Sequence, residues 1–535
     1  MTEFFFRTED IRPDEVGNYF VESHQDRKII SSLKNINPTI LVGSRGVGKS
    51  FLLRIAQKEL MDELEFKGAF PVYISFVRSS LLQSTDPEQF KHWMLAKICS
   101  AIIRALQKQG LLASIPRSAL SLSGGEVNDS EITAIEKIAE EYENSWKNPS
   151  PIIDKNLIPS VDKLKETLED LSDELSIKRF VLLIDEAAHI FVPEQQRQFF
   201  TLFRDLRSHC ITCNAAVYPG VTSFGETFQP AHDATMLTIE RDVMASDYVT
   251  NMREIVEKQA DASILKNIAQ YGKNFSILAY SASGNPRLLL KTLAAAPKVN
   301  STQVNEIIRE FYRSDIWSEH SVLADKYIGH RDVIDWGRNF VEGLLLPEIK
   351  SKNDNYLSAD KKTSAFLWVH RDAPSEVKEA LRVLNYTGIL SEQASGIKAS
   401  RSEIGTRYAV NLGCLFALEP TPTSVSFEIT QGLTPKRMTE FGANHPFFRN
   451  LTEKVANLPT QTGDYALHEQ LDKPITVLDI SKWQQSKLLE LGLNKIGDVL
   501  SAPEKKLKQA SYIGDVRARR LRNAAVAAVF EYLSG

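Results

Sequence analysis

Long apolar runs are missing from this sequence. No stretch approaches the roughly 18 apolar residues that a membrane-spanning helix needs, so we expect no transmembrane segment and no membrane partner. Cysteine is also scarce, because the 535 residues contain only four, too few for a disulfide framework. The first residues, MTEFFFRTEDIRPDE, lack the basic start and the apolar stretch of a signal peptide. These absences predict a cytoplasmic protein.

Neither sign of charge is in large excess. Lys and Arg number 64 and Asp and Glu number 68, which gives a net charge of −4. The chain as a whole is therefore no polycation, and any nucleic-acid surface must be local. Cys210 and Cys213 form a single CxxC pair inside an apolar run, without a second pair. We interpret them as buried strand thiols rather than as a zinc site.

One glycine-rich stretch, TILVGSRGVGKSFLL, carries a complete P-loop pattern. It reads Gly43-x-x-x-x-Gly48-Lys49-Ser50, after a strand pattern and before a helical one. Glycine lets backbone N–H groups turn toward phosphates with no Cβ in the way, and the following helix offers its positive end. We expect Lys49 to contact the β and γ phosphates of ATP and Ser50 to hold Mg²⁺. The predicted nucleotide-binding residues are Gly43, Ser44, Arg45, Gly46, Val47, Gly48, Lys49, Ser50 and Phe51.

A second motif complements the P-loop. The stretch RFVLLIDE, residues 179–186, is a continuous apolar run that ends in two acids, as a buried parallel strand does. We predict that Asp185 binds Mg²⁺ and that Glu186 orients or deprotonates the attacking water. Two acids with these separate tasks would support ATP hydrolysis, with Lys49 as a further catalytic residue.

Strand and helix patterns alternate in the first part of the chain. Strands are expected at 39–42, 71–77, 179–186 and 211–218, and helices within 23–36, 50–64 and 194–208. This alternation predicts an α/β fold with a doubly wound parallel sheet. Helical patterns dominate again from about 246 to 345.

The P-loop, the Asp185-Glu186 pair and Gly284-Asn285-Pro286-Arg287 together resemble an AAA+ ATPase. More narrowly, the chain resembles the origin-recognition and cell-division-cycle initiator clade and its relatives, including the signal-transducing STAND group. In that clade a helical lid follows the core, and an arginine called sensor 2 reaches the γ-phosphate. The resemblance assigns this catalytic role to Arg287. Asn285-Pro286 is equally typical of a helix N-terminus with an exposed arginine.

Two further family features have no clear counterpart. Sensor 1 is a polar residue near the end of the strand after the acidic pair, and Asn214, Tyr218 and Thr222 are its candidates. An arginine finger is expected shortly before a fifth strand at about 235–240, yet no Arg or Lys occurs between His209 and Glu240. Arg204, Arg207 or Arg241 could substitute. This gap favours a nucleotide-controlled switch or a partner-activated ATPase over a processive motor.

The chain divides into six predicted units. A polar, turn-rich stretch at 350–362 and the sequence PTPTS at 420–424 indicate boundaries in the second half. The units are an N-terminal segment (1–22), an AAA+ core (23–242), a helical lid and connector (243–349), a winged-helix domain (363–420), a connector (425–465) and a helix-hairpin-helix-like domain (473–535).

The predicted winged-helix domain is an amphipathic helix ending at Gly388, followed by two strand patterns around a basic tip. Lys398, Arg401 and Arg407 form this tip, and we predict that Arg401 and Arg407 contact nucleic acid. The initiator clade carries such a domain after its lid. Winged helices also dock on proteins, which remains the alternative.

The C-terminal segment resembles helix-hairpin-helix DNA-binding units and the C-terminal domain of the bacterial RNA polymerase α subunit. Ile513-Gly514 would be the turn that faces a phosphate, although Tyr512 stands where a glycine is usual. Residues 495–522 hold eight Lys or Arg against three Asp or Glu. A solvated helical cap is the alternative to DNA contact. The residues predicted to contact nucleic acid here are Gly514, Arg517, Arg519 and Arg520, with Arg522 nearby.

These features predict an ATP-dependent DNA-binding AAA+ ATPase that acts as a nucleotide-controlled switch, with ATP and Mg²⁺ as its ligands. Its setting would be phage defence, a mobile element or a process like replication initiation. The alternatives are a STAND-like sensor, whose rear units bind a partner protein and control oligomerisation, and a chaperone-like remodeller that binds no nucleic acid. A separately encoded effector and a nucleotide-dependent homo-oligomer fit the first two hypotheses.

Overall fold

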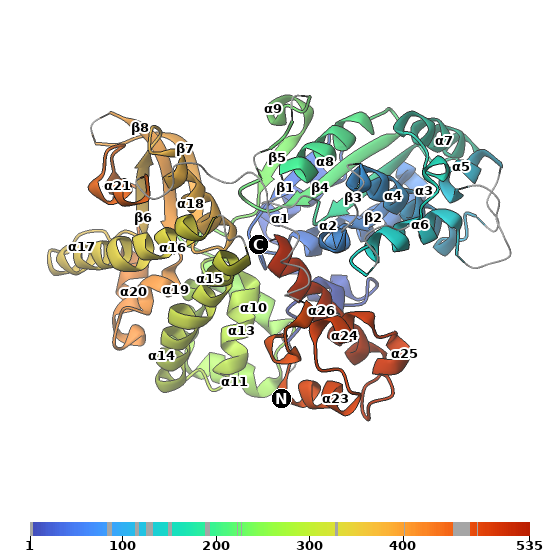
Figure 1. The fold of residues 1–535 in the computed structure, drawn as a ribbon. Coiled ribbons are helices and arrows are strands. Elements are labelled where there is room, and N and C mark those ends of the chain that lie inside the picture. Colours follow the sequence, from blue (N-terminus) through green and yellow to red (C-terminus); the bar gives the residue numbers. More distant parts are fainter. Residues whose placement is uncertain are drawn as a thin grey trace.

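A computed structural model places four parts of the chain in space (Figure 1). An α/β core lies on one side, a helical lid and a second β-containing unit lie on the other, and a helical C-terminal unit lies beneath the core. The structure describes residues 4–82, 88–112, 117–124, 132–147, 152–187, 193–221, 223–225, 227–326, 330–400, 402–452, 471–478 and 480–534.

The core is built on a five-stranded parallel sheet in the order β2-β3-β4-β1-β5. Its strands are β1 (Thr39–Val42), β2 (Ala69–Ser75), β3 (Arg179–Asp185), β4 (Ile211–Val217) and β5 (Thr235–Thr238). All five strands match the expected stretches closely, although β2 begins and ends two residues before the predicted 71–77. The P-loop and the acidic pair therefore follow the carboxyl ends of β1 and β3, on one edge of the sheet.

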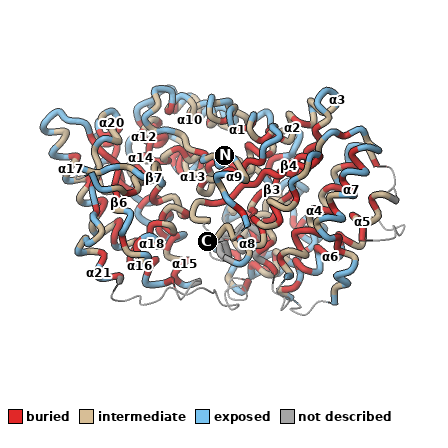
Figure 2. The backbone as a smooth tube through the Cα atoms, turned by 90° about the horizontal axis from the view of Figure 1, so that it is seen from above, coloured by how far each residue is buried: buried red, intermediate tan, exposed pale blue. Residues whose placement is uncertain are grey.

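Helices cover both faces of this sheet, which confirms the doubly wound α/β prediction. Alternate residues of β3 bury against opposite faces, with Leu182 in one apolar cluster and Leu183 in the other. Figure 2 shows β3 and β4 largely buried between the two layers. The helices of the core are α1 (His24–Leu33), α2 (Lys49–Asp62), α3 (Leu64–Lys67), α4 (Gln89–Lys108), α5 (Leu120–Ser123), α6 (Ala134–Glu143), α7 (Val161–Glu174), α8 (Pro193–Asp205) and α9 (Pro230–Asp233).

Short 3-10 helices join these elements. Two of them lie in the segment that precedes α1, and a third follows β2 directly. They are η1 (Thr8–Asp10), η2 (Val16–Tyr19), η3 (Val77–Leu81), η4 (Arg117–Ala119) and η5 (Lys155–Leu157), and η9 (Ile475–Val477) lies in the C-terminal unit.

The predicted helical lid follows the sheet and continues into long helices. Its helices are α10 (Tyr248–Glu257), α11 (Ala262–Gln270), α12 (Gly272–Ser281), α13 (Pro286–Ala295), α14 (Ser301–Glu310), α15 (Ile316–Lys326), α16 (Arg331–Asn339) and α17 (Leu346–Ser358). π-helical turns at Phe311–Asp315 and Phe340–Leu345 link α14 to α15 and α16 to α17. One apolar cluster runs from Tyr248 to Leu451, so the lid and the second β unit share a core.

The predicted boundary at 350–362 is wrong for most of its length, because α17 extends to Ser358. Its polar residues hid an amphipathic pattern: Leu346, Ile349 and Asn353 are buried on one face. On the exposed face, Lys350 pairs with Asp354 four residues later. The turn after α17 is confined to residues 359–362.

The second β unit contains a helix followed by a hairpin, as predicted, but it is larger than expected. Its elements are β6 (Phe366–His370), α18 (Ser375–Tyr386), β7 (Leu390–Lys398), β8 (Ile404–Val410), α19 (Leu412–Phe416), α20 (Pro422–Gly432), β9 (Thr439–Phe441) and α21 (Pro446–Thr452). The strands form a sheet in the order β7-β8-β6-β9, in which β9 runs parallel to β6.

PTPTS does not end this unit. Pro422 occupies the first turn of α20, where a missing N–H costs nothing, so the stretch starts a helix. The predicted connector at 425–465 thus holds most of α20, with β9 and α21 up to residue 452, and its residues 453–465 lie outside the described ones.

The C-terminal unit is helical, as predicted. It consists of α23 (Lys482–Glu490), α24 (Ile496–Ser501), α25 (Glu504–Leu507) and α26 (Asp515–Ser534), which bury an apolar core of their own. Leu81 of η3 belongs to the same cluster, so this unit is docked on the core.

Two expectations from composition concern the described residues. Among them, no helix has both the length and the apolar character to cross a membrane. Cys210 and Cys213 are buried free thiols beside and within β4, and burial raises the pKa of the Cys213 thiol to about 12. The interpretation as buried strand thiols is confirmed.

Candidate nucleotide site

The P-loop lies between β1 and α2, and its backbone has the shape that its glycines allow. Gly46 has φ 79° and Gly48 has φ 106°, both in the left-handed region that favours glycine. A Cβ on Gly46 would lie 2.6 Å from Arg287 Cβ and from Asn285 Oδ1. The glycine thus lets the lid approach the loop closely.

Lys49 begins α2 and its side chain is folded into the loop. Its Nζ donates to the carbonyl oxygens of Gly43 at 2.6 Å and Ser44 at 3.2 Å, and lies 4.0 Å from the centre of the Tyr218 ring. Burial lowers the pKa of Lys49 to about 8, partly opposed by the nearby Glu186 and Asp185 carboxylates. A phosphate chain would give this ammonium a stronger partner than two carbonyl groups.

The two acids at the end of β3 have different surroundings. Asp185 is fully buried, and its oxygens accept from the Tyr73 hydroxyl at 2.7 Å and from the Glu186 N–H at 3.0 Å. Glu186 has φ 56°, an uncommon conformation for a residue with a side chain. Its Oε1 accepts from the Tyr218 hydroxyl at 2.8 Å, whereas Oε2 is buried with no hydrogen-bond partner among the described residues.

Burial, together with the neighbouring Asp185 charge, raises the pKa of Glu186 to about 7. Lys49 and the Tyr218 hydroxyl act in the opposite direction. A carboxyl group with a pKa near neutrality can accept and release a proton under ordinary conditions, which suits a general base.

The residues that would hold Mg²⁺ fit that ion. Ser50 lies in the first turn of α2, and each Asp185 oxygen keeps a second lone pair beyond its internal hydrogen bond. Mg²⁺ prefers oxygen ligands and retains several of its waters, so a hydroxyl and one carboxylate are sufficient protein ligands.

Of the two sensor 1 candidates that the structure describes, Tyr218 lies beside the acids and Asn214 does not. Asn214 lies opposite Thr39 at the far end of the sheet, where its side chain accepts from the Thr39 N–H and donates to the Leu33 carbonyl. Asn214 therefore joins strands rather than facing the site. Thr222 lies outside the described residues.

The lid places Arg287 next to the P-loop. Asn285 caps α13 by accepting from the N–H groups of Arg287 and Leu288, and donates to the Arg45 carbonyl at 2.6 Å. Arg287 Nε donates to the Phe6 carbonyl at 3.0 Å. The motif is therefore a helix N-terminus, and it carries a half-buried Arg287 to the P-loop, whereas the sensor 2 role of Arg287 stays a prediction.

Arg241, a possible substitute for an arginine finger, contacts its own P-loop. Its guanidinium donates to the Val47 carbonyl at 2.8 Å and lies 3.7 Å from Asp26. Of the other two candidates, Arg204 in α8 pairs with Asp205, and Arg207 is exposed just after the end of α8.

The contact of α18 with the P-loop was not predicted from the sequence. Tyr386 accepts a hydrogen bond from Arg45, whose guanidinium lies 5.0 Å from the Tyr386 ring and 5.6 Å from the Tyr218 ring. Arg382 of the same helix donates to the Gly220 carbonyl at 3.1 Å, just after β4. Tyr386 is more than 300 residues from Arg45, so no local pattern could have revealed this contact.

The N-terminal segment lies next to Arg287 of the lid and also contacts the C-terminal unit. Asn523 of α26 donates to Asp10 at 3.1 Å, and the Arg520 guanidinium lies 4.8 Å from the centre of the Phe5 ring. Arg520, predicted to contact nucleic acid, thus packs inward against this segment. The neighbouring Phe6 is the residue that holds Arg287.

The other predicted nucleic-acid residues fall in different places. Arg407 is not at the hairpin tip as expected: it lies within β8, opposite Trp368, and its guanidinium is 5.8 Å from the Phe366 ring. Side chains alternate between the two faces along a strand, so the Arg407 side chain lies over one face of the sheet and not at the tip of the hairpin. Arg401 lies outside the described residues. Gly514, Arg517 and Arg519 lie together at the start of α26.

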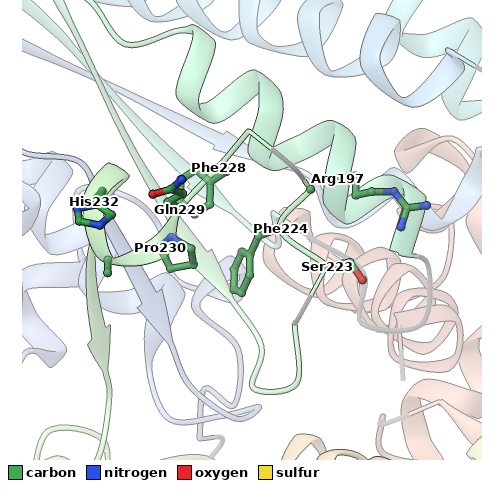
Figure 3. Close-up of a pocket in the computed structure, with 9 residues that line it drawn as sticks. Arg197, Ser223, Phe224, Phe228, Gln229, Pro230 and His232 are labelled. Atoms are coloured by element: carbon green, nitrogen blue, oxygen red, sulfur yellow. The ribbon is translucent and has the colours of Figure 1, made fainter.

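Two cavities lie near these elements, and one of them borders the P-loop. One, of about 770 Å³, is lined by Gly43 and Ser44 of the P-loop, the end of β5 and the β7–β8 hairpin. The other, of about 640 Å³, lies on the outer surface between α8 and α9 (Figure 3). Its Arg197 is paired with Glu194 at 2.7 Å. Neither is lined by Lys49, Asp185 or Glu186.

Comparison with known proteins identifies the core. A family model described as ORC-CDC6-like matches residues 4–179, which include the P-loop and stop just before Asp185. A search of curated proteins found no match.

Three solved structures show a distant likeness. The chain is 13% identical to the Walker-type ATPase PABY2304 of Pyrococcus abyssi, over 79% of this chain and 97% of that one, with a TM-score of 0.36. It is 14% identical to the Aeropyrum pernix ORC1 protein in complex with DNA, over 78% and 95%, with a TM-score of 0.29. For the Aeropyrum pernix ORC2 protein in ADPNP-ADP complexes the identity is 12%, over 76% and 90%, with a TM-score of 0.31.

These TM-scores are too low to support a shared arrangement of the whole chains, so the family match and the sheet carry the identification. The match covers the P-loop, and the parallel sheet brings the acidic pair and the lid arginine to the same loop. The predicted resemblance is thereby confirmed for the core: residues 4–179 are similar to the ORC-CDC6-like family, and the parallel sheet carries the P-loop and the acidic pair of an AAA+ P-loop ATPase.

Proposed function

We propose that this protein is an ATP-dependent DNA-binding ATPase that works as a nucleotide-controlled switch. The observation that carries the proposal is the position of Arg45. This P-loop residue contacts the lid through Asn285 and the second β unit through Tyr386. A nucleotide bound to the P-loop would therefore affect the contacts of Arg45 with both units.

Hydrolysis would use the residues gathered at the edge of the sheet. Lys49 and Arg287 would contact the phosphates, Ser50 and Asp185 would hold Mg²⁺, and Glu186 would deprotonate the attacking water. Bound Mg²⁺ supplies charge neutralisation on the phosphate oxygens. The unpartnered Oε2 of Glu186 is the acceptor available for that proton, since Oε1 already accepts from Tyr218.

The switch follows from differential affinity. A ligand shifts a conformational equilibrium only as far as it binds one state better than the other. In the structure Lys49 is satisfied by P-loop carbonyls while α18 rests on Arg45. We infer that a bound triphosphate draws Lys49 away and changes the position of α18. Hydrolysis through Glu186 then resets the protein.

DNA is the proposed ligand of the rear units. The ORC-CDC6-like match supports this class of ligand, as does the local excess of basic residues near the start of α26. The setting in phage defence, a mobile element or an initiation-like process stays a prediction, as do a separate effector protein and nucleotide-dependent assembly of several copies.

The test measures binding of a fluorescent DNA duplex by anisotropy with ATP, with ADP and without nucleotide. We expect the affinity to differ between the ATP and ADP states. Glu186→Gln should keep the ATP-state affinity because it binds ATP without turnover. Lys49→Ala should lose nucleotide binding and give one affinity throughout. Equal affinity of the wild type in all three conditions would reject the switch.

Salt dependence tests the tail. The logarithm of the affinity should fall with the logarithm of the salt concentration by about 0.9 for each phosphate contact. Changing Arg517 and Arg519 together to Ala should flatten this slope by roughly 1.8, because two contacts are lost. An unchanged slope in the double variant would remove the tail from the DNA surface.

A further inference from the structure

The hairpin before α26 presents an exposed aromatic ring. Tyr512 occupies the position where such hairpins usually have glycine, and it adopts the glycine conformation, with φ 67°. This backbone conformation is costly for a bulky residue. Its side chain is 81% exposed, so burial of the ring does not offset that cost. A strained and exposed aromatic residue indicates a role outside the fold.

A second aromatic ring lies beside it. Trp483 of α23 is 40% exposed, and the Arg517 guanidinium lies 5.1 Å from the centre of its ring. The same guanidinium donates to the Tyr512 carbonyl at 2.9 Å. Lys487 lies 6.0 Å from the Trp483 ring and helps to position it, because its ammonium pairs with Glu490 at 2.7 Å and donates to Ser511 at 3.1 Å. We call Trp483, Lys487, Tyr512 and Arg517 the aromatic platform.

The platform is part of a wider concentration of exposed apolar side chains. Among the described residues, twelve large apolar side chains are exposed, and five of them belong to the C-terminal unit. They are Val477, Trp483, Leu489, Tyr512 and Val516. In Figure 1, α23 and α25 lie at the outer edge of the molecule, whereas α26 runs back toward the core.

The basic residues around the platform are fewer than the sequence suggested. Lys508 is paired with Asp515, Arg522 lies near Glu504, and Arg520 packs against Phe5. A surface that depends on a long row of phosphate contacts needs more unpaired cations than this. Stacking of a base on an aromatic ring, supported by a few cations, matches what the platform offers.

We propose that the aromatic platform binds an unpaired stretch of nucleic acid, with one base stacked on Tyr512 and another on Trp483, while Arg517 faces the backbone. Bases in a duplex stack on each other and hide their faces, so the ligand must be single-stranded or locally opened. This inference rests on the proposed function in that it takes DNA as the ligand class.

The test compares three fluorescent probes by anisotropy: a single strand of mixed sequence, the corresponding duplex, and a single strand of abasic residues. The abasic strand keeps the phosphates and lacks the bases. The wild type should bind the ordinary single strand about tenfold more tightly than the abasic one, because stacking contributes strongly for each base. Equal affinity for these two strands would overturn the proposal.

Tyr512→Gly is the decisive variant, because glycine adopts φ 67° without strain while the ring is lost. It should fold at least as well as the wild type and lose about tenfold in single-strand affinity, with duplex affinity changed less than about twofold. Tyr512→Phe should keep single-strand binding. Phe66→Ala, which removes another ring that is 85% exposed, is the matched control and should change nothing.

The outcomes separate this proposal from the switch. If Tyr512→Gly binds the single strand as tightly as the wild type, the platform serves another partner, such as a protein, and the proposal is wrong. If nucleotide-dependent duplex binding persists in that case, the proposed function stands. If the wild type binds none of the three probes, both proposals fail.

Discussion

Glu186 has two unlike oxygens, and this asymmetry sets its chemistry. One oxygen is engaged by the Tyr218 hydroxyl, and the other is buried without a partner among the described residues. Burial and the Asp185 charge raise the pKa of Glu186 to about 7. The group is therefore partly protonated near neutral pH, and its fraction in the basic form depends steeply on pH.

The pH dependence of ATP hydrolysis should report this group. Because only the ionised form accepts a proton, kcat/KM should rise as pH increases and level off above about 7. Tyr218→Phe removes a hydrogen bond that stabilises the carboxylate, so the midpoint should move to higher pH. Glu186→Gln should lower kcat at least about 100-fold while ATP still binds. Initial rates of phosphate release across pH provide the measurement.

A profile without this rise, or a midpoint unmoved in Tyr218→Phe, would place the base elsewhere.

Glu186 also affects the stability of the fold, with the opposite dependence on pH. The folded state holds an extra proton on Glu186 between the ordinary pKa of 4.5 and about 7. Its contribution to the free energy of unfolding is thus present at low pH and lost as pH rises through about 7.

Sequence reasoning worked best at residues whose role is local. The P-loop glycines and the Asp185-Glu186 pair could be predicted, because each sits next to the strand that positions it. The position of Asn214 at the opposite end of the sheet from the acids could be read only from the sheet register. The inward turn of Arg520 needed the position of Phe5, more than 500 residues away.

At the scale of one element, α13 joins the lid to the P-loop through its first residue. Asn285 both caps the helix and donates to the Arg45 carbonyl at 2.6 Å. These two tasks use different atoms of one amide group, since the oxygen accepts and the nitrogen donates. They can therefore be separated by substitution.

Asn285→Ala should lose both tasks, whereas Asn285→Asp should lose only the donor. Loss of the cap should lower the free energy of unfolding by about 1 kcal/mol, and Asp should largely restore it. Both variants should weaken binding of an ATP analogue, because neither can hold the Arg45 carbonyl. Thermal unfolding and titration with the analogue check the two effects. Wild-type nucleotide affinity in Asn285→Asp would show that the lid contact is dispensable.

Elements were predicted well where one pattern dominated and poorly where two signals competed. Polar composition concealed α17, although Leu346 and Ile349 mark its buried face. In PTPTS the prolines signal a break, but Pro422 favours the first turn of a helix and α20 starts there. The strand β9 has only three residues, too few to show a period.

At the scale of the whole molecule, the contact between Arg45 and Tyr386 links the ATPase core to the second β unit. The Tyr218 and Tyr386 rings lie 5.4 Å apart, and the Arg45 guanidinium lies near both. A change in the phosphate site could reach α18 directly through these three side chains. Energetic coupling between the two sites is then a measurable quantity.

Tyr386→Ala should uncouple the two units. We expect its ATP affinity to stay within a few-fold of the wild type, while the ratio of its DNA affinities in ATP and ADP falls to about one. Tyr386→Phe keeps the ring and loses the hydroxyl, so it should show an intermediate ratio. Tyr271→Ala, on an exposed part of the lid, is the control. A wild-type ratio in Tyr386→Ala would exclude this route of coupling.

The hydrogen bond between Asp10 and Asn523 spans 513 residues of chain. A ribosome makes the segment around Asp10 long before it makes Asn523, so the two can meet only after the whole stretch between them has been synthesised. Large proteins fold unit by unit as they emerge, with the earlier parts first. A nascent chain halted before α26 would already hold Lys49 and both acids. Its N-terminal segment, which contacts Arg287, would still lack the hydrogen bond from Asn523.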